Sequence, residues 1–562
     1  MKPAYDVIVL GSGAAGMAAC LFARLNGLSA LLVERTDHLG GTSAFSAATT
    51  WVPGSLLAAS VGAPADDIEH ARTFLNETVG NHSSAAMRDA FLHWGPQAIA
   101  RLQNETQLQF RARPSHPDYI QEAQGATLCG RALEPLPFDG RKLGSRLTLI
   151  RPPIPEFTIL GGLMIDRDDI AHLLKMKQNR ESFLYAAKLI ARYGIDRLTH
   201  RRGTRLVMGN AMIGRLLASL DATGADIVTQ AETEELLTEG GCVIGIRLRL
   251  EGRSHDITAK RGVVMATGGF NRHPTRRAEM LHQPTAAHSP GAPGHTGKIH
   301  DLALALGAHY GEGGMDNAFW APVSIRRRAD GTTAVFPHFV LDRGKPGTIS
   351  VNAAGRRFVN ESTSYHLFVR AMYESHKSVP TIPTFLIADA EALRKYGLGM
   401  VRPGGRGLKP FLEDGYLVEA PSLAALAGKL GIDAAGLEES VKRMNEFART
   451  GVDTEFGRGT TAYHRVNGDA THGPNPNIGP IATAPFYAVR LLPGDIGAAT
   501  GMVANTSAQV MKQDGTPIPG LYAVGNDMQS VMGGVYPAPG ITIGPALAFA
   551  YAAAAHLTAG RA

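Results

Sequence analysis

The sequence is poor in cysteine and has no long apolar run. Its 562 residues include three cysteines, Cys20, Cys129 and Cys242, and none of them belongs to a CxxC or CxxCH motif. This spacing excludes a disulfide framework, a zinc cluster and a c-type haem on the chain, and it fits a reducing compartment with no metal site. No uninterrupted apolar stretch reaches the ~18 residues of a spanning helix, and a strand pattern begins at Tyr5, which leaves no room for a signal peptide. We therefore expect a cytoplasmic protein that does not cross a membrane.

A strong net charge and a second dinucleotide motif are also missing. The formal charge of +6 is too small to indicate a nucleic-acid-binding protein by itself. No second GxGxxG motif follows a strand pattern, which argues against a monooxygenase or reductase driven by a pyridine nucleotide. The 65 glycines and 44% hydrophobic residues are instead typical of a soluble, glycine-rich α/β enzyme.

The N-terminal segment carries a complete dinucleotide-binding fingerprint. A buried-strand pattern at 5–10 is followed by the motif GSGAAG at 11–16 and an apolar helix pattern at 17–26, and a second strand ends at Glu34. Such a turn brings the backbone close to a pyrophosphate at a helix N-terminus, and an acid about 20 residues further on binds a ribose hydroxyl. The alternative for Glu34 is a plain solvated strand end. The cofactor residues expected here are Gly11, Gly13, Ala14, Ala15, Gly16, Glu34 and Arg35.

Two further glycine-rich turns favour FAD over NAD. The stretch LGGTSAFS at 39–46 is similar to the turn that lies along the pyrophosphate and flavin in many flavoproteins of the fumarate reductase type. The stretch ATGG at 266–269 resembles the turn that covers FAD in flavoproteins with two dinucleotide-binding domains. No histidine follows the first turn at the place where succinate dehydrogenases attach their flavin, so we expect non-covalent FAD; an ordinary Gly/Ser loop is the alternative. The cofactor residues expected in these turns are Gly40, Gly41, Thr42, Ser43, Ser46, Ala47, Ala266, Thr267 and Gly268.

The C-terminal stretch VYPAPGITIGPA at 535–546 holds groups suited to chemistry. It follows an apolar run at 521–524 and precedes an Ala-rich helix pattern at 547–557, with Pro545 in the first turn of that helix. The phenol O–H of Tyr536 and a nearby backbone N–H offer two converging donors, as an oxyanion hole requires. Lys, Arg and His are absent from 533–546, which favours a neutral ketone over a dicarboxylate. The remaining expected cofactor residues are Gly525, Asn526, Gly540 and Ile543.

A basic segment at 145–202 departs from the rest of the chain. An apolar loop at 157–165 precedes a helical pattern that runs from 168 to 202, where eight Lys or Arg stand against four Asp or Glu. A basic amphipathic segment beside an apolar loop can make peripheral contact with an anionic membrane. The alternative is the solvated edge of a domain.

The order of these patterns predicts an α/β fold. We expect a Rossmann-type FAD-binding domain at 1–320 that contains the 145–202 insertion, an inserted α+β catalytic cap domain at 321–495, and a C-terminal return to the FAD-binding domain at 496–562.

The assembled motifs resemble those of the 3-ketosteroid Δ1-dehydrogenases over nearly the full length of the chain. They are GSGAAG, GGTSAFSAATTWVPG, PDY at 117–119, the GRALEP–PFD run, ATGGF, VNAAGRRFVNESTSY and YPAPGITIGPALAF. Fumarate reductases share only the FAD pieces of this set. The resemblance implies that Tyr119, Tyr365, Tyr536 and Gly540 surround the A ring of a steroid. The 151–202 stretch resembles members that act on sterols with an aliphatic side chain, such as cholest-4-en-3-one.

The activity implied by this resemblance is 1,2-dehydrogenation of a 3-ketosteroid. Tyr536 and Gly540 would polarise the ketone, and Tyr365 would take the proton of carbon 2, its pKa lowered by a hydrogen bond from Tyr119. The hydride of carbon 1 would pass to FAD, and a quinone or an electron-transfer protein would reoxidise it. Taken singly, each tyrosine is more often a packing residue. The alternatives are a 3-ketosteroid dehydrogenase acting at carbons 4 and 5, a fumarate or enoate reductase, and a membrane-docked electron-transfer subunit.

Overall fold

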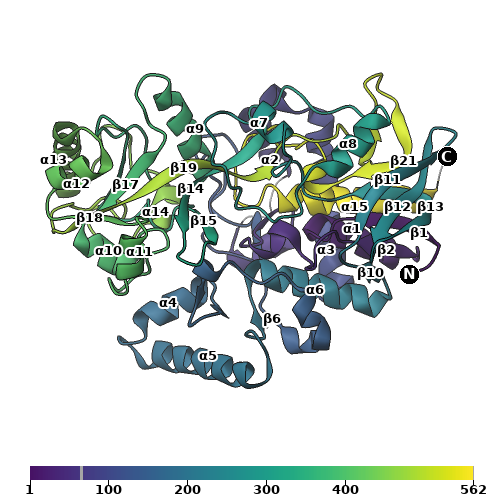
Figure 1. Ribbon diagram of the computed structural model, residues 1–562, viewed down its shortest axis with the longest axis horizontal. Helices are drawn as coiled ribbons and strands as arrows, with labels where there is room; N and C mark the ends of the chain where they lie inside the picture. The colour runs from purple at the N-terminus through teal and green to yellow at the C-terminus, as the bar shows by residue number, and fades with distance from the viewer. Residues whose placement is uncertain (64–67, 561–562) are drawn as a thin grey trace.

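Two β-sheets lie toward opposite ends of the long axis of the molecule (Figure 1). The computed structural model describes residues 1–63 and 68–560; residues 64–67 of the predicted 1–320 domain and residues 561–562 of the predicted C-terminal return lie outside it. Three smaller sheets pair β3 (Thr50–Trp51) and β4 (Phe110–Ala112) with β5 (Ala132–Pro135), β6 (Phe138–Asp139) with β9 (Arg205–Leu206), and β7 (Thr158–Ile159) with β8 (Leu163–Met164).

The first sheet is built around parallel strands in the order β10-β2-β1-β13-β21, flanked by antiparallel strands. Leu10 pairs with both Val33 and Met265, and Met265 pairs with Ala523, so four parallel strands end at one edge. Ligands of open α/β sheets bind outside this carboxyl edge. The strands are β1 (Ala4–Leu10), β2 (Ala30–Val33), β10 (Asp226–Val228), β11 (Glu232–Glu239), β12 (Cys242–Leu250), β13 (Arg253–Met265), β20 (Gln509–Met511) and β21 (Pro517–Ala523).

Helices cover this sheet because its central strands are almost wholly apolar. Strand β2 and the end of β1 are fully buried, as expected for parallel strands with helices on both faces. Helix α1 packs against α15 and α6, and α15 also packs against α3. The helices of this part are α1 (Ala14–Leu25), α2 (Ile68–Thr78), α3 (Ala85–Glu105), α6 (Met208–Thr223), α7 (Arg276–Met280), α8 (Lys298–Ala305) and α15 (Ile543–Ala559).

The second sheet is antiparallel and lies within the chain between β13 and β21. Its order is β15-β14-β19-β17-β16, with β18 also paired to β19. The strands are β14 (Ala318–Arg327), β15 (Thr333–Pro337), β16 (Thr348–Val351), β17 (Thr384–Ala388), β18 (Val418–Ala420) and β19 (Phe486–Ala498). The helices beside it are α9 (Tyr365–His376), α10 (Ala390–Tyr396), α11 (Lys409–Glu413), α12 (Leu423–Leu430), α13 (Ala434–Thr450) and α14 (Ala462–Asn467). The boundaries expected at 320/321 and 495/496 fall inside β14 and β19 and stay predictions.

The basic insertion forms a small unit below the other elements in Figure 1. The continuous helix expected from 168 to 202 is wrong, because the segment divides into α4 (Arg167–Lys175) and α5 (Arg180–Thr199). Asn179 begins the second helix by accepting a hydrogen bond from the N–H of Ser182 at 2.8 Å, a cap that requires a non-helical residue at that position. The unit has its own apolar contact of Leu163, Leu189 and Tyr193. Among the described residues, no helix combines the length and the apolarity that spanning a bilayer requires.

Candidate active site

The fingerprint turn packs backbone against backbone at the carboxyl edge of the first sheet. Gly11 has a φ of +98°, and a Cβ there would lie 2.3 Å from the carbonyl oxygen of Ala266. A Cβ at Gly16 would lie 1.9 Å from the carbonyl oxygen of Gly11. These two positions therefore require glycine, and they bring the N-terminus of α1 next to the turn at 266–269, as the motif predicts. A helix N-terminus of this kind attracts phosphate.

The second glycine turn lies along the first. The N–H of Gly40 donates to the carbonyl of Ser12 at 3.1 Å, and the hydroxyl of Ser43 accepts from the N–H of Ala14 at 3.1 Å. A Cβ at Gly41 would lie 3.6 Å from the Cα of Gly13. In the same turn, the hydroxyl of Ser46 donates back to the carbonyl of Ser43, whereas Ala47 is exposed. The cofactor residues expected at 11–16 and at 40–46 thus lie together at the carboxyl edge of the first sheet.

Glu34 is buried and is not a solvated strand end. One of its carboxylate oxygens accepts hydrogen bonds from the N–H and hydroxyl of Ser12, at 3.1 and 2.5 Å. The other accepts from the N–H and hydroxyl of Thr36, both at 2.8 Å. The carboxylate therefore braces the fingerprint turn, and its contact with a ribose stays a prediction. Its neighbour Arg35 is exposed and donates to the hydroxyl of Thr296 at 2.6 Å.

Asp527 is a buried carboxylate that the sequence reasoning missed. It accepts from the N–H of Gly269 at 2.8 Å, from the backbone and hydroxyl of Thr267, and from Nε2 of His300 at 2.9 Å. Thr267 thus directs its hydroxyl to Asp527. Although burial raises it, the pKa of Asp527 lies below its ordinary value because His300 and Thr267 stabilise the carboxylate. Its position directly after Gly525-Asn526 was the available signal, and its effect is to join the 266–269 turn to the C-terminal return.

Two buried donors near these turns have no partner among the described residues, and they fit a phosphate-bearing cofactor. Nδ1 of His295 and Nε of Arg151 are the unpartnered atoms. Nε2 of His295 lies 3.3 Å from the hydroxyl of Thr42, and a Cβ at Gly268 would lie 2.5 Å from this nitrogen. Gly268 therefore leaves room for an imidazole. Orphaned buried donors of this kind require an acceptor, which a phosphate or ribose oxygen supplies.

The C-terminal turn packs against Trp51 and against the N-terminus of α1. Gly540 has a φ of +93°, and its carbonyl accepts from the N–H of Trp51 at 3.2 Å. A Cβ at Gly544 would lie 1.9 Å from the carbonyl oxygen of Trp51, and one at Gly525 would lie 2.8 Å from the Cβ of Ala15. A small cavity of about 10 Å³ lies beside the start of α15, and its lining includes Phe319, Asn526, Thr542 and Pro545.

The three tyrosines implied by the resemblance come together from three distant parts of the chain. The phenol oxygens of Tyr119 and Tyr365 lie 3.2 Å apart. The ring of Tyr536 stacks on that of Tyr119 at 5.8 Å and meets that of Tyr365 edge-on at 5.1 Å. The N–H of Tyr119 donates to the carbonyl of Pro537 at 2.8 Å, which ties this ring to the turn that carries Tyr536 and Gly540.

A fourth tyrosine, Tyr463 of α14, completes a group that we call the tyrosine cluster: Tyr119, Tyr365, Tyr463 and Tyr536. The ring centroid of Tyr463 lies 4.7 Å from that of Tyr119, and its phenol oxygen is buried without a partner among the described residues. No sequence motif marked this residue. Phe339 and Phe319 close the cluster through edge contacts with Tyr365 and Tyr536 at 5.0 and 5.2 Å.

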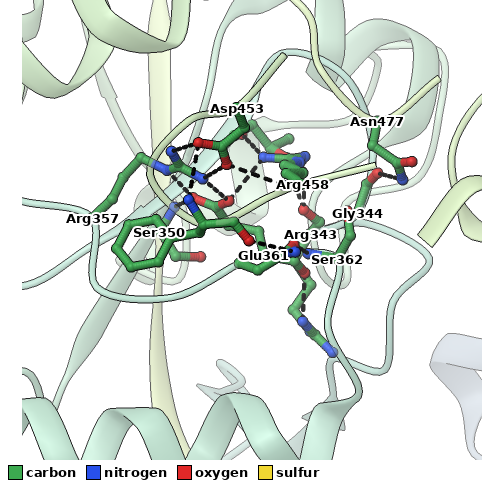
Figure 2. A network of polar contacts seen from close by, with 12 residues as sticks. Arg343, Gly344, Ser350, Arg357, Glu361, Ser362, Asp453, Arg458 and Asn477 are labelled. Carbon is green, nitrogen blue, oxygen red and sulfur yellow. Dashed lines mark hydrogen bonds and ion pairs between the residues drawn. The ribbon is translucent and has the colours of Figure 1, made fainter. Parts of the chain in front are cut away.

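A buried ion network fixes the backbone that leads into Tyr365 (Figure 2). The carboxylate of Glu361 accepts from Arg357 at 2.7 and 2.8 Å and from Arg458 at 3.2 Å. Asp453 accepts from Arg357 at 2.8 Å, and Arg343 donates to the carbonyls of Glu361 and Thr363 at 2.6 and 3.0 Å. Against the effect of burial, Arg357 and Arg458 hold the pKa of Glu361 below its ordinary value. Two kinds of group therefore hold the turn before α9. Arginines bind the carboxylate of Glu361, and the carbonyls of Glu361 and Thr363 accept hydrogen bonds from Arg343.

The tyrosine cluster is strongly desolvated. Burial raises the pKa values of Tyr119 and Tyr365 well above the ordinary value, and it raises that of Tyr536 as well. The expectation that Tyr119 would lower the pKa of Tyr365 is not met, because burial raises this pKa and the nearby phenols of Tyr119 and Tyr536 raise it further. Tyr365 is the first residue of α9, however, and the positive end of a helix dipole favours a phenolate at that position.

Comparisons with known proteins agree with this architecture. The profile of the family described as "FAD binding domain" matches residues 6–543. A 3-oxosteroid 1-dehydrogenase of Mycobacterium tuberculosis is 36% identical over 98% of this chain and 98% of its own length. A 4-oxocyclohex-2-ene-1-carboxylate 5-dehydrogenase of Sinomonas cyclohexanicum is also 36% identical, over 98% of this chain and 93% of its own.

One solved structure matches this chain over nearly its full length. The 3-ketosteroid Δ1-dehydrogenase of Sterolibacterium denitrificans, in complex with 1,4-androstadiene-3,17-dione, matches with a TM-score of 0.93 at 35% identity, over 99% of this chain and 100% of that one. The predicted FAD-binding fold and FAD cofactor are therefore confirmed. The chain belongs to the FAD binding domain family of flavoprotein oxidoreductases, within the group that includes the 3-oxosteroid 1-dehydrogenases.

Proposed function

We propose that the protein removes the hydrogens of carbons 1 and 2 from 3-keto-4-ene steroids and passes the electrons to FAD. The observation that carries this proposal is the meeting of Tyr119, Tyr365 and Tyr536 beside the glycine turn at 540. Relatives named 3-oxosteroid 1-dehydrogenases support it at 35–36% identity over nearly the full chain. A ring ketone is common to the compounds named for these relatives, because the 4-oxocyclohex-2-ene-1-carboxylate enzyme is as similar to this chain as the 3-oxosteroid enzymes are.

The ketone is polarised by two donors from one turn. In this proposal the phenol of Tyr536 and the N–H of Gly540 donate to the ketone oxygen, where negative charge grows as carbon 2 loses its proton. One such preorganised donor contributes about 3–4 kcal/mol in oxyanion holes of acyl-transfer enzymes. Because Gly540 is held by the contact with Trp51, its N–H needs no reorientation during the reaction.

Tyr365 takes the proton of carbon 2. Its phenol lies within hydrogen-bond reach of Tyr119 and at the N-terminus of α9, where the positive end of the helix dipole stabilises the phenolate as it accepts and releases a proton. The buried phenol of Tyr463 packs behind Tyr119 and excludes water from this side.

The cofactor is held by the glycine edge described above. Bound FAD supplies the hydride acceptor for carbon 1. The N-terminus of α1, the turn at 40–43 and the donors of His295 and Arg151 would hold its phosphate and ribose groups without a covalent link. A quinone or an electron-transfer protein serves as the external acceptor.

The 145–202 insertion adds two finer points to the proposal. The substrate carries an aliphatic side chain, as in sterols, and the insertion makes peripheral contact with an anionic membrane from the inner, cytoplasmic face. This second point is supported by exposed apolar side chains on α4 and α5, which are Ile170, Leu174, Phe183, Leu184, Ile190, Ile195 and Leu198. Basic residues alternate with them, which favours an anionic lipid surface.

Anaerobic mixing of the purified yellow protein with androst-4-ene-3,17-dione tests the reaction. We expect stoichiometric bleaching of the visible flavin band and formation of the 1,4-diene. A flavin that stays oxidised with short- and long-side-chain 3-ketosteroids alike would sink the steroid proposal. Bleaching by a 5α-reduced steroid with a 4-ene product would instead support the alternative reaction at carbons 4 and 5.

A further inference from the structure

Asp316 is a buried carboxylate beside the two segments that carry Tyr365 and Tyr536. It lies just before β14, its side chain is 3% exposed, and no motif in the sequence marked it. The proposed reaction assigns it no role. A carboxylate that is buried this far costs free energy unless neighbouring groups stabilise its charge. The residues that contact Asp316 come from both of these segments.

The backbone of Asp316 packs against the turn that leads into Tyr536. The N–H of Met315 donates to the carbonyl of Gly533 at 2.7 Å. Gly534 has a φ of +80°, and a Cβ there would lie 2.2 Å from the carbonyl oxygen of Asp316. Glycine permits both this conformation and this close approach. The position of Asp316 is therefore fixed against the chain two residues before Tyr536.

The side chain of Asp316 reaches α9. Nε2 of His366 lies 3.3 Å and Nη1 of Arg370 lies 3.6 Å from the same carboxylate oxygen. His366 and Arg370 are four residues apart on this helix and therefore lie on one face of it. The other carboxylate oxygen lies 3.2 Å from Nε2 of the exposed His282. Although burial raises it, the pKa of Asp316 lies below its ordinary value, because His366 and Arg370 stabilise the carboxylate.

His366 is itself held in one orientation. Its Nδ1 accepts a hydrogen bond from the N–H of Trp320 at 3.2 Å. Burial lowers the pKa of His366, so the imidazole is neutral at pH 7 and its single N–H is on Nε2, where it meets the carboxylate of Asp316 as a dipole meets a charge. The ring centroid of His366 lies 6.0 Å from that of Tyr536, and Tyr365 is the preceding residue of the helix. One carboxylate therefore holds the first turn of α9 next to the ring of Tyr536.

We infer that Asp316 is a positioning residue for removal of the proton from carbon 2. Its backbone is joined to the turn whose Tyr536 polarises the ketone, and its side chain is joined to the helix that begins with the base, Tyr365. The distance between the phenol of Tyr365 and carbon 2 of a ketone bound at Tyr536 is therefore set at Asp316. This inference rests on the proposed function and adds a residue to the same site. Asp316 takes no part in proton or hydride transfer itself.

The experiment compares Asp316→Asn with the parent holoenzyme, using androst-4-ene-3,17-dione and its forms deuterated at carbon 1 or at carbon 2. We expect kcat to fall about 10–100-fold with KM changed by less than about twofold, because a small misplacement of the base slows the chemical step. The isotope effect of deuterium at carbon 2 should rise, since proton removal is slowed, and that at carbon 1 should not. Arg370→Gln, at a side chain that is 38% exposed, removes one contact with α9 and should give the same pattern with a loss of about threefold. Asp389→Asn, which alters a buried carboxylate that caps α10, is the matched control and should change none of these values.

The outcomes separate this inference from the reaction on which it rests. An unchanged carbon 2 isotope effect in Asp316→Asn, or a rise at carbon 1 alone, would overturn it while the proposed reaction stands. An equal loss of kcat in Asp389→Asn would show general destabilisation and would also overturn it. If Asp316→Asn does not retain its flavin, the carbon 2 isotope effect of Arg370→Gln decides in its place. If the flavin of the parent enzyme is bleached by no 3-ketosteroid, the proposed function fails and the inference falls with it.

Discussion

At the residue scale, the proposed chemistry depends on a few side chains brought together from remote positions. One hydrogen bond and three ring contacts join Tyr119, Tyr365 and Tyr536. None of them lies in a cluster of charges, so their acid–base behaviour is dominated by burial. This makes the phenol group, rather than an ionised side chain, the ground state of the site at neutral pH.

Replacing Tyr365 with Phe should lower kcat by about 10²–10⁴-fold, the usual contribution of a positioned general base. Tyr463→Phe is the matched control, because its phenol is buried but has no partner among the described residues. We expect it to cost less than about tenfold. Pre-steady-state flavin bleaching measures both. An equal loss in the two variants would show that packing rather than proton transfer is being perturbed.

The rate should rise with pH over the alkaline range. Burial raises the pKa of Tyr365, and the base must be deprotonated to act, so the active fraction grows as pH increases toward that raised pKa. The measurement is kcat against pH from 6 to 10 with a neutral steroid, with flavin content checked at each point. A plateau beginning near pH 6 would contradict this assignment of the base.

At the element scale, the turn before α9 is held by charges rather than by apolar contacts. The carboxylate of Glu361 is fully buried and pairs with Arg357 and Arg458. Arg357 also pairs with Asp453 (Figure 2). A buried ion network of this kind orients the segments that carry it. The free-energy cost of desolvating its charges offsets much of their mutual attraction. Its effect on function is to fix where the first residue of α9 lies.

Replacing Glu361 with Gln should destabilise the protein by about 3–5 kcal/mol, since it takes the paired carboxylate from the buried guanidinium of Arg458 and leaves Arg357 with Asp453 and Glu455 alone. Urea unfolding measures this change. Glu446→Gln, which removes an exposed partner of Arg449, is the control and should have no measurable effect. A similar midpoint for both variants would mean that the buried network is not structural.

The start of α15 tests how closely the C-terminal return packs. Gly544→Ala places a Cβ 1.9 Å from the carbonyl oxygen of Trp51, so we expect loss of bound FAD and a lower melting temperature. Gly428→Ala in α12 has open space around its Cβ and should stabilise its helix slightly. Flavin-to-protein ratio and thermal unfolding distinguish the two. Retention of full flavin by Gly544→Ala would contradict this packing.

At the scale of the whole molecule, the insertion at 145–202 is a part with much exposed apolar surface. It leaves several large apolar side chains exposed, among them Leu184 at 66% and Leu198 at 83%. Such a concentration on one unit is unusual for a surface with no partner.

The double variant Leu184→Ser with Leu198→Ser should reduce sedimentation with phosphatidylglycerol vesicles by at least about tenfold and leave turnover of dissolved androst-4-ene-3,17-dione unchanged. The reason is that both side chains are on the exposed face of α5. Leu56→Ser, at 89% exposure elsewhere on the molecule, is the control. Loss of steroid turnover in the double variant would instead favour the electron-transfer-subunit alternative.

The sequence by itself determined the cofactor edge, because that edge is made of backbone. Positions such as Gly11 and Gly16 tolerate no Cβ. The spacing of these glycines can therefore be recognised in the sequence, and it predicts where the pyrophosphate binds. The resemblance likewise brought forward Tyr119, Tyr365, Tyr536 and Gly540. The direction of the pKa of Tyr365, however, was expected wrongly, because desolvation depends on what packs around the phenol.

Only the tertiary structure decided the features that depend on long-range contacts. Asp527 binds a turn 258 residues away, Tyr463 joins the cluster without a motif, and the helix expected from 168 to 202 breaks at a cap. Local patterns record what a backbone needs, whereas the partner of a buried side chain is set by which distant segments the fold brings beside it.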